Sequence, residues 1–404
     1  MNQQGISPMD DGPRCQCALV PVSADPITFG HLDIVSRAAA ISERAVLLVC
    51  DNDNKRDGYL FTLQERVAMA TAAVRLAGLD TVEIMASSGL LADVALRENA
   101  DCIVRGVRSE RDLAEDQRQE EYHSMVWSGM NGRFRYLTAN DGLRNVSSTL
   151  VKAFVRRGVD VSCLVPAFVK AALEARMRGV WPVGVTGGIA SGKTYVCRSL
   201  TELLRQRGAE VQHVDFDEIV RQIYREDSPG ARALRQDLAI LIGHEVLDDD
   251  GRMDPMKMRD RLFGQNCSDE LRRQAHELMV PHVWRAYREH TAGLHGILLV
   301  EWAKLAEMGM GGLVNHCVIA VQSPDRETLL DKRGINRGMA ESIMSRQVSE
   351  DERLTLLGQA AAKNGFGWVV SYINRLDDQQ SLGLLADELK GRLPPAFTPR
   401  TEEA

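Results

Sequence analysis

The chain has 404 residues, of which 44% are hydrophobic, 26% are charged and 5% are aromatic, and its formal net charge is -7 at pH 7. This composition is typical of folded globular proteins and excludes collagen-like, disulfide-scaffold and wholly disordered chains. At about 150 residues per domain, the length predicts two or three domains. The acidic balance argues against a protein that neutralises a nucleic-acid backbone, so we expect no nucleic-acid partner.

Cysteine spacing and hydropathy indicate where in the cell the protein is expected. The eight cysteines are scattered, and no two have the C-x-x-C spacing of zinc or redox sites. Cys15 and Cys17 lie close together, but their place at the start of an apolar run favours a strand over a pair of ligands. No apolar stretch reaches the roughly 18 residues of a membrane span, and residues 1–14 do not resemble a signal peptide. We therefore expect a soluble, cytoplasmic protein with no membrane partner.

Apolar runs and helical patterns alternate along the first part of the chain. The expected strands are residues 17–22, 45–50, 82–85 and 102–105, and the expected helices are residues 31–42, 63–76, 90–99 and 166–178. Strands interleaved with helices indicate a parallel sheet covered on both faces. Gly179 is placed to stop the last of these helices.

A second alternation follows Gly179. It comprises expected strands at 183–185 and 211–214 and expected helices at 193–207 and 271–296, with Trp284 and Tyr287 in the core. We therefore expect two doubly wound α/β domains with parallel sheets. Their predicted extents are a tail at 1–14, a domain at 15–178, a linker at 179–182, a domain at 183–393 and a tail at 394–404.

The most specific motif is a phosphate-binding loop. Its letters are GGIASGKT, which fit the pattern G-x-x-x-x-G-K-[ST] between an expected strand and an expected helix. Backbone N–H groups of such a loop bind phosphate oxygens, the lysine reaches the β- and γ-phosphates, and the hydroxyl binds Mg²⁺. This setting favours an ATP site over a glycine-rich turn without a ligand. The expected ATP-binding residues are Gly187, Gly188, Ile189, Ala190, Ser191, Gly192, Lys193 and Thr194, the last also as metal ligand.

Two carboxylates follow the next expected strand, in the run HVDFD at residues 213–217. Ligands bind at the carboxyl ends of parallel strands, so Asp215 and Asp217 are expected beside the γ-phosphate. One carboxylate can accept the proton of an attacking hydroxyl, and the other can help to hold the metal. The alternative is that Asp217 is the N-cap of a helix, and both roles could coexist.

From about residue 181 to residue 393 the chain resembles dephospho-coenzyme A kinase. Besides the loop and the two aspartates, the resemblance rests on Arg221, on SPG at 228–230 and on GHEVLDDDG at 243–251. It implies helical acceptor and lid insertions. It also implies that Asp217 meets the ribose 3'-hydroxyl of the acceptor and that Arg221 binds acceptor phosphate or shapes its pocket.

The same resemblance implies a mobile lid over residues 324–352, from which an arginine neutralises charge on the transferring phosphoryl group. The polar lid residues are Arg333, Arg337, Arg346 and Gln347; Arg333 is the expected substrate contact, and the resemblance does not single out which lid arginine acts in phosphoryl transfer. The chain departs from the family at MDP (253–255), VP (280–281) and AKL (303–305), where the family has L-D-R, His-Pro and P-L-L.

A second pattern of phosphate-site residues, SADPITFGH, occupies residues 23–31 after the first expected strand. Gly30 permits close approach of a nucleotide, and the helix start at His31 favours anions. An imidazole there can donate a hydrogen bond to a phosphate oxygen as negative charge builds. By itself, a histidine at a helix start is more often a cap or a surface residue.

The surrounding blocks resemble phosphopantetheine adenylyltransferase. They are DPIT (25–28), GHLDIV (30–35), FTL (61–63), ERV (65–67), VRGVR (104–108) and VSSTLVK (146–152). The resemblance implies in-line attack of the phosphopantetheine phosphate on the α-phosphate of ATP, with pyrophosphate leaving. The roles it implies are His31 for the transition state, Lys55 and Ser23 for the attacking phosphate, Arg105 for the pantetheine end, and Thr28, Gly30, Arg108, Ser148 and Thr149 for ATP and its phosphates.

Together the two resemblances predict a fused enzyme for the last two steps of coenzyme A synthesis. Its expected ligands are ATP with Mg²⁺, 4'-phosphopantetheine, dephospho-coenzyme A and coenzyme A. Because similar adenylyltransferases are hexameric, a homo-oligomer through the N-terminal domain is also expected. The alternative is a kinase with an inactive, nucleotide-sensing or oligomerising N-terminal module. It is motivated by VSA at 22–24, Phe29 and LRN at 143–145, where the family has G-T-F, Asn and Trp-Ser-Phe.

Overall fold

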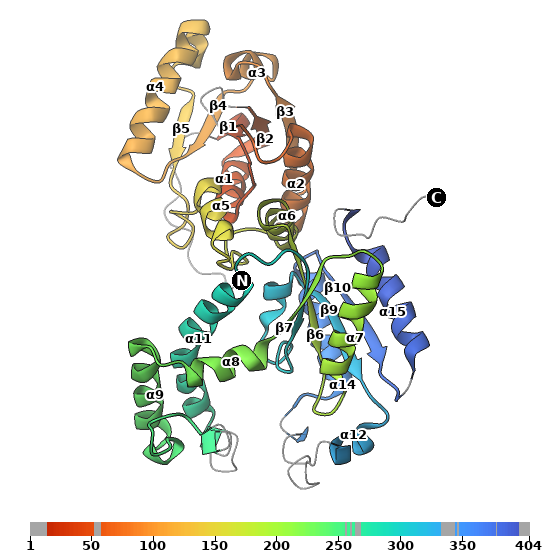
Figure 1. Cartoon of the computed structure of the whole chain (residues 1–404). Helices are drawn as coiled ribbons and strands as arrows, with labels where there is room; N and C mark the ends of the chain where they lie inside the picture. Colours follow the sequence, from red (N-terminus) through yellow and green to blue (C-terminus); the bar gives the residue numbers. More distant parts are fainter. Residues whose placement is uncertain are drawn as a thin grey trace. The chain divides into compact units, whose positions relative to one another are not determined.

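The computed structural model describes residues 14–51, 58–254, 257, 258, 261, 262, 268–332, 344, 345, 347–376 and 378–395. The chain forms two compact units. The first comprises the residues up to Arg156 together with Asp160–Leu173, and the second comprises Arg157–Val159 together with the residues from Glu174 on. Each unit contains one five-stranded parallel sheet covered by helices (Figure 1). The predicted class of two parallel-sheet α/β domains is therefore confirmed.

The sheet of the first unit has the strand order β3-β2-β1-β4-β5. The chain therefore winds outward from β1 in one direction and then in the other, as a doubly wound sheet does. Its elements are β1 (Cys15–Val22), α1 (Phe29–Ala40), β2 (Ser42–Cys50), α2 (Leu63–Leu76), β3 (Val82–Ser87), α3 (Leu91–Arg97), β4 (Cys102–Gly106), α4 (Glu110–Val126), the 3-10 helix η1 (Ser128–Met130), β5 (Phe134–Leu137), α5 (Ser148–Arg156) and α6 (Ala167–Arg178), whose last residues belong to the second unit.

The sheet of the second unit has the strand order β10-β9-β6-β8-β7, so the phosphate-loop strand β6 lies at its centre. The elements are β6 (Val180–Thr186), α7 (Lys193–Gln206), β7 (Val211–Asp215), α8 (Phe216–Arg225), α9 (Pro229–Ile242), η2 (His244–Val246), α11 (Asp269–Thr291), β8 (Gly296–Glu301), η3 (Met310–Val314), β9 (Cys317–Gln322), α12 (Arg326–Lys332), α14 (Glu350–Lys363), β10 (Trp368–Ile373) and α15 (Gln379–Arg392).

Apolar side chains from the central strands form the core of each unit. Leu19 and Val46 are fully buried in the first, and Val300 and Val318 are buried in the second. Helices α8, α9 and α11 lie together and share a smaller apolar cluster that includes Leu238 (Figure 1). None of the helices in the described part of the chain combines the length and the apolar character that a bilayer span requires.

Several element boundaries differ from the sequence-based ones. The expected helix 31–42 begins earlier, because Thr28 caps α1, and it ends at Ala40, because Ser42 already belongs to β2. The expected helix 271–296 ends at Thr291, and Gly296 starts β8, where its φ is +82° and an added Cβ would lie 2.1 Å from the carbonyl oxygen of Glu210.

The predicted linker overlaps a strand. Residues 180–182 are the first residues of β6, and the change from one unit to the other falls within α6, after Leu173. A closing helix at 167–178 is present, as the proline and glycine signals predicted. The domain limits at 15–178 and 183–393 stay a prediction.

Candidate active sites

The phosphate loop of the second unit joins the end of β6 to the start of α7. A Cβ on Gly187 would lie 2.2 Å from the carbonyl oxygen of Val321 on β9. Gly192 has a φ of +86°, and a Cβ there would lie 2.1 Å from Nδ2 of Asn374, which donates to the carbonyl oxygen of Ser191 at 3.1 Å. Close packing thus requires glycine at both positions, and β9 and Asn374 fix the course of the loop.

Lys193 and Thr194 are the first residues of α7. The Lys193 Nζ donates to the carbonyl oxygen of Gly188 at 3.0 Å, so the side chain folds back over the loop. The Thr194 hydroxyl donates to Oε1 of Glu301, at the end of β8, at 2.6 Å. These contacts gather a cation, a hydroxyl and a carboxylate at the carboxyl ends of β6 and β8. Sequence reasoning did not assign Glu301 a role, although its place at a strand end was a usable signal.

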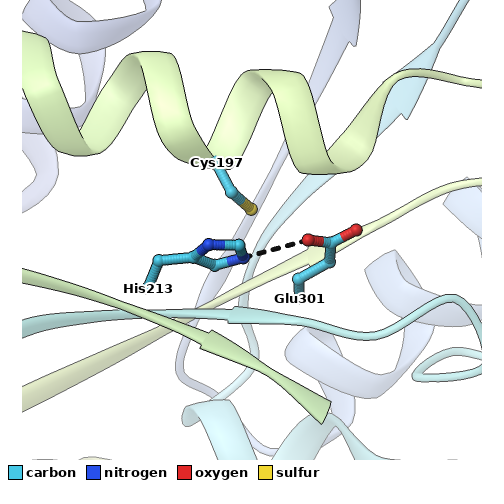
Figure 2. Close-up of side chains that lie close together, drawn as sticks. All are labelled: Cys197, His213 and Glu301. Carbon is cyan, nitrogen blue, oxygen red and sulfur yellow. Dashed lines mark hydrogen bonds and ion pairs between the residues drawn. The ribbon is translucent and has the colours of Figure 1, made fainter. Parts of the chain in front are cut away.

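Glu301 is buried, with 7% of its surface exposed. Its Oε2 lies 2.9 Å from Nε2 of His213 on β7, and Cys197 of α7 stands beside the pair (Figure 2). Burial alone would raise the pKa of Glu301, but the hydrogen bonds from His213 and Thr194 outweigh it and lower that pKa. Glu301 is therefore held as a carboxylate next to the phosphate loop.

Asp215, and not Asp217, is the N-cap of α8. Its Oδ1 accepts the backbone N–H of Glu218 at 3.0 Å, whereas Asp217 lies in the first turn of the helix. The interpretation of Asp217 as the cap was therefore wrong. A capping oxygen must precede the N–H group that it accepts by two or three residues, and Asp215 has that position. Arg221, on the next turn, donates to Oε2 of Glu218 at 2.7 Å and lies 3.6 Å from Oδ2 of Asp215.

The Asp217 carboxyl group lies exposed in the first turn of α8, and its pKa is raised above the ordinary value. Loss of hydration around the carboxyl group is the largest cause of this rise in pKa, and the negative charge of Asp215 adds to it. The positive charge of Lys193 lowers the pKa. Lys304 is a further cation that interacts with Asp217, and loss of hydration lowers the pKa of this lysine. A raised pKa brings a carboxylate closer to the value that suits a general base at neutral pH.

Only part of the expected lid can be compared with the structure. Arg333, Arg337 and Arg346 lie outside the described residues. Gln347 is described, and its Oε1 accepts the backbone N–H of Ile189 in the phosphate loop at 2.9 Å. The expected lid therefore contributes at least one direct contact to the loop.

In the first unit, His31 is bound to the residue that caps α1. The Oγ1 of Thr28 accepts the backbone N–H of His31 at 3.3 Å, and Nδ1 of His31 accepts the backbone N–H of Thr28 at 3.1 Å. Because Nδ1 is the acceptor, the neutral ring carries its proton on Nε2. His31 thus completes the capping box of α1 as its N3 residue, and its ring orientation makes Nε2 a donor.

Asp25 joins the loop after β1 to two distant segments. It is fully buried, and its carboxylate accepts the N–H groups of Leu60 and Phe61 at 3.2 and 3.0 Å and the Nζ of Lys152, on α5, at 2.7 Å. Burial alone would raise the pKa of Asp25, but the bonds from Lys152 and the two amides lower it. Asp25 and Lys152 lay inside the sequence blocks, yet sequence reasoning gave them no role.

The backbone of the same loop is bound by a buried arginine. Arg66 is 1% exposed, and its NH1 group donates to the carbonyl oxygens of Ser23 and Cys50 at 2.7 and 3.1 Å. The guanidinium also pairs with Asp51 and lies 4.0 Å from the ring centre of Tyr59. Arg66 therefore connects the ends of β1 and β2 at the predicted site, and sequence reasoning missed it.

The first turn of α5 lies against this loop, because the Ser148 hydroxyl donates to the carbonyl oxygen of Pro26 at 2.8 Å. Thr149, the next residue, is exposed. Gly30 faces protein backbone: a Cβ there would lie 3.3 Å from the carbonyl oxygen of Val146 and 3.4 Å from that of Leu143. The close approach that Gly30 permits in this structure is thus to the turn before α5.

Arg105 and Arg108 line a pocket of about 570 Å³ at the carboxyl ends of β1, β2 and β4. Arg105 donates to Oδ1 of Asp116 at 3.0 and 2.5 Å, and Arg108 donates to Oδ2 of Asp112 at 2.9 Å. His31 is not among the residues that line this pocket. Lys55 lies outside the described residues.

Comparison with known proteins decides the family. Residues 19–154 match the cytidylyltransferase-like family, and residues 181–364 match the dephospho-CoA kinase family. A phosphopantetheine adenylyltransferase of Histophilus somni (strain 2336) is 35% identical over 160 residues, which are 40% of this chain and 98% of that protein. By its N-terminal residues, the chain belongs to the phosphopantetheine adenylyltransferase family.

Among solved structures, that of TT1252 from Thermus thermophilus covers 53% of this chain and 98% of its own, with 22% identity and a TM-score of 0.40. The two resemblances read from the sequence are confirmed by the family matches. The chain therefore fuses an adenylyltransferase unit to a kinase unit, both of coenzyme A biosynthesis. In the kinase unit the predicted Lys193 and Thr194 follow β6, whereas Asp215 ends β7 and Asp217 follows it, with β8 between the two strands. In the adenylyltransferase unit Thr28 binds His31, Ser148 binds the loop at Pro26, and Arg105 and Arg108 line a pocket.

Proposed function

We propose that the two units act in sequence, the first transferring the adenylyl group of ATP to 4'-phosphopantetheine and the second phosphorylating the 3'-hydroxyl of the resulting dephospho-coenzyme A. The observation that carries this proposal is the presence, in one chain, of two parallel-sheet units that match the families of these consecutive steps. The product of the first reaction is the acceptor of the second.

In the adenylyltransferase unit, His31 is the proposed catalytic residue. A phosphate oxygen of phosphopantetheine attacks the α-phosphorus of ATP, a new P–O bond forms, and the bond to pyrophosphate breaks. Negative charge grows on the equatorial oxygens, where a donor at the start of α1 is most effective. The Nε2–H tautomer of His31 supports this role. Ser23, Lys55, Thr28, Gly30, Ser148 and Thr149 remain the proposed substrate contacts, with Arg105 and Arg108 in the pocket.

In the kinase unit, the proposed general base is Asp217 and the proposed phosphate ligand is Lys193. Asp217 takes the proton of the 3'-hydroxyl as its oxygen attacks the γ-phosphorus, and ADP leaves. The raised pKa of Asp217 supports its role as proton acceptor. Arg221 and Arg333 remain proposed acceptor and phosphoryl contacts.

Magnesium is the proposed metal partner of ATP. The hydroxyl of Thr194, the Glu301 carboxylate that holds it and the Asp215 carboxylate offer hard oxygen ligands, which fit Mg²⁺. The ion would offset charge on the β- and γ-phosphates. A cytoplasmic location, a homo-oligomer through the adenylyltransferase unit and the absence of a nucleic-acid partner also remain proposals.

The proposal is tested with the full-length protein, 4'-phosphopantetheine and Mg-ATP. We expect dephospho-coenzyme A to be a transient intermediate, pyrophosphate to lead ADP while it is present, and the two to reach equal amounts once all of it has become coenzyme A. ADP formation from supplied dephospho-coenzyme A without any pyrophosphate from phosphopantetheine would instead identify a kinase with an inactive N-terminal module.

A further inference from the structure

A side-chain cluster behind the phosphate loop has a composition that ATP chemistry does not require. Cys197 comes from the second turn of α7, His213 from β7 and Glu301 from the end of β8 (Figure 2). One ligand atom of each residue lies within 4.8 Å of those of the other two. We propose that Cys197, His213 and Glu301 bind one transition-metal ion, with Zn²⁺ the best fit, and that this ion inhibits the kinase step.

The fold brings the three groups to one face of the sheet. Residues 213 and 215 point to the same side of β7, and the register pairs Asp215 with Glu301, so His213 and Glu301 are diagonal neighbours. Helix α7 packs over β7 and β8 and places Cys197 above the pair. Cys197 is fully buried, and the side chains of His213 and Glu301 are 18% and 8% exposed. The edge strand β7, its neighbour β8 and a packed helix therefore hold the cluster.

The distances suit a tetrahedral ion after a small contraction. Zn–S and Zn–N bonds of about 2.3 and 2.0 Å place the ligand atoms of a zinc site roughly 3.5 Å apart. The longest separations in the cluster, up to 4.8 Å, therefore have to close by about 1 Å, while the 2.9 Å pair of His213 Nε2 and Glu301 Oε2 opens slightly; side-chain rotation can supply both changes. Binding transfers the Cys197 thiol proton to solvent, because the thiolate is the ligand, and it moves the His213 ring proton from Nε2 to Nδ1, because the metal takes the lone pair of Nε2. Water can complete the fourth position.

The thiolate, imidazole and carboxylate of this cluster disfavour Mg²⁺, the metal that accompanies ATP. Sulfur and imidazole suit Zn²⁺ and Co²⁺, whereas Mg²⁺ demands oxygen ligands in octahedral geometry. The thiolate and the carboxylate also offset the charge of a divalent ion, and Asp215 adds a further negative charge nearby. The same side chains therefore distinguish a transition metal from Mg²⁺.

Inhibition follows from the double role of Glu301. Its carboxylate accepts the hydroxyl of Thr194, the residue proposed to bind Mg²⁺, at 2.6 Å. A metal that draws Glu301 toward Cys197 and His213 weakens this contact and misplaces Thr194. This second half of the proposal rests on the proposed kinase function, whereas the metal site itself does not.

The test uses full-length protein freed of metal and titrated with Co²⁺, whose thiolate charge-transfer absorption reports sulfur ligation, followed by displacement with Zn²⁺. We expect one equivalent to bind, the absorption to be absent in Cys197→Ala, and His213→Gln to bind about 100-fold or more weakly. Cys163→Ser is the matched control, because Cys163 is an exposed thiol of the other unit. It should bind Co²⁺ like the wild type.

Kinase activity is then measured on supplied dephospho-coenzyme A with excess Mg-ATP, each protein relative to its own metal-free rate. We expect Zn²⁺ to inhibit the wild type and Cys163→Ser at concentrations about 100-fold lower than those that inhibit Cys197→Ala or His213→Gln. Sulfur ligation that persists in Cys197→Ala, or no ligation in the wild type, overturns the metal site. Ligation with equal inhibition of all variants overturns the inhibitory role. A metal-free wild type without kinase activity contradicts the proposed function instead.

Discussion

The two phosphate sites are built from the chain in different ways. In the kinase unit, one run of eight residues, 187–194, supplies the loop, the lysine and the hydroxyl. In the adenylyltransferase unit, the loop after β1 is held by contacts with distant residues. Its Asp25, for example, binds Lys152, which is 127 residues away in the sequence. A contiguous site can therefore be recognised from local sequence, whereas a dispersed site depends on tertiary contacts and is sensitive to substitutions far from the chemistry.

The largest effect is expected for Lys193→Ala. It removes the ammonium group that we propose binds the β- and γ-phosphates, so phosphorylation of supplied dephospho-coenzyme A should fall by about 10³-fold or more. Pyrophosphate release from phosphopantetheine and ATP should be unchanged. Both rates are measured in one preparation, and a kinase rate within threefold of the wild type contradicts the assigned site.

The next effect is expected for His31→Ala in the dispersed site. Loss of one transition-state donor should lower adenylyl transfer by about 10² to 10³-fold, with a smaller loss of ATP affinity. Phosphorylation of supplied dephospho-coenzyme A is the internal control and should not change. If the fall in rate equals the loss of ATP binding, His31 acts on the ground state and is not a transition-state donor.

A substitution at Lys152 tests the dependence of this site on tertiary contacts. Lys152→Met leaves the buried Asp25 carboxylate with only its two amide partners, and we expect a loss of about 3 kcal/mol in the stability of the adenylyltransferase unit. Lys363→Met, at an exposed lysine of the kinase unit, is the matched control. Chemical denaturation, followed separately in each unit, measures the free energy of unfolding of wild type and variants. We expect Lys152→Met to lower it in the first unit alone.

The stability lost in Lys152→Met should depend on pH in a defined direction. The folded-state pKa of Asp25 is lowered, so its contribution to stability is present above the unfolded-state value, about 3.9, and is lost as the pH falls through the folded-state value. In Lys152→Met the carboxyl group should protonate at higher pH. The stability difference between wild type and variant should therefore shrink as the pH is lowered from 7 toward 4, and a constant difference contradicts the ion pair.

A pair of glycines, one in each site, contrasts tight with looser packing, and the smallest expected effect is that of Gly30→Ala. Gly187→Ala places Cβ 2.2 Å from a backbone oxygen of β9, so the phosphate loop must shift, and we expect a cost of about 3 kcal/mol with loss of kinase activity. Gly30→Ala meets its nearest oxygen at 3.3 Å, and a cost of about 1 kcal/mol is expected. Thermal denaturation of both variants tests this order.

Sequence patterns predicted a helix or strand accurately where particular residues mark its limits. The helix expected at 63–76 has the same limits in the structure, because Thr62 and Glu65 form a capping box at its start. Helix α4 was not predicted, since it buries none of its residues and so lacks the apolar stripe that periodicity detects. Strand β5 has four residues, too few to show alternation.

The sites follow the same rule. The loop at 187–194 and the aspartates at the end of β7 and the start of α8 could be predicted because motif and strand end lie together in the sequence. The partners of Asp25, the role of Arg66 and the contact of Glu301 with Thr194 could not be derived, because each joins residues separated by at least 15 positions along the chain. The N-cap of α8 was misassigned by two residues, which only the hydrogen bond of Asp215 reveals.

The central claim is that one chain carries two independent active sites whose reactions follow one another. The most direct test mixes His31→Ala and Lys193→Ala proteins and measures coenzyme A formed from 4'-phosphopantetheine and Mg-ATP. Each variant alone should form little coenzyme A, and Lys193→Ala should accumulate dephospho-coenzyme A with an equal amount of pyrophosphate. The mixture should restore synthesis, because each protein supplies the site that the other lacks. A mixture of folded variants that forms no more coenzyme A than the single variants contradicts the account.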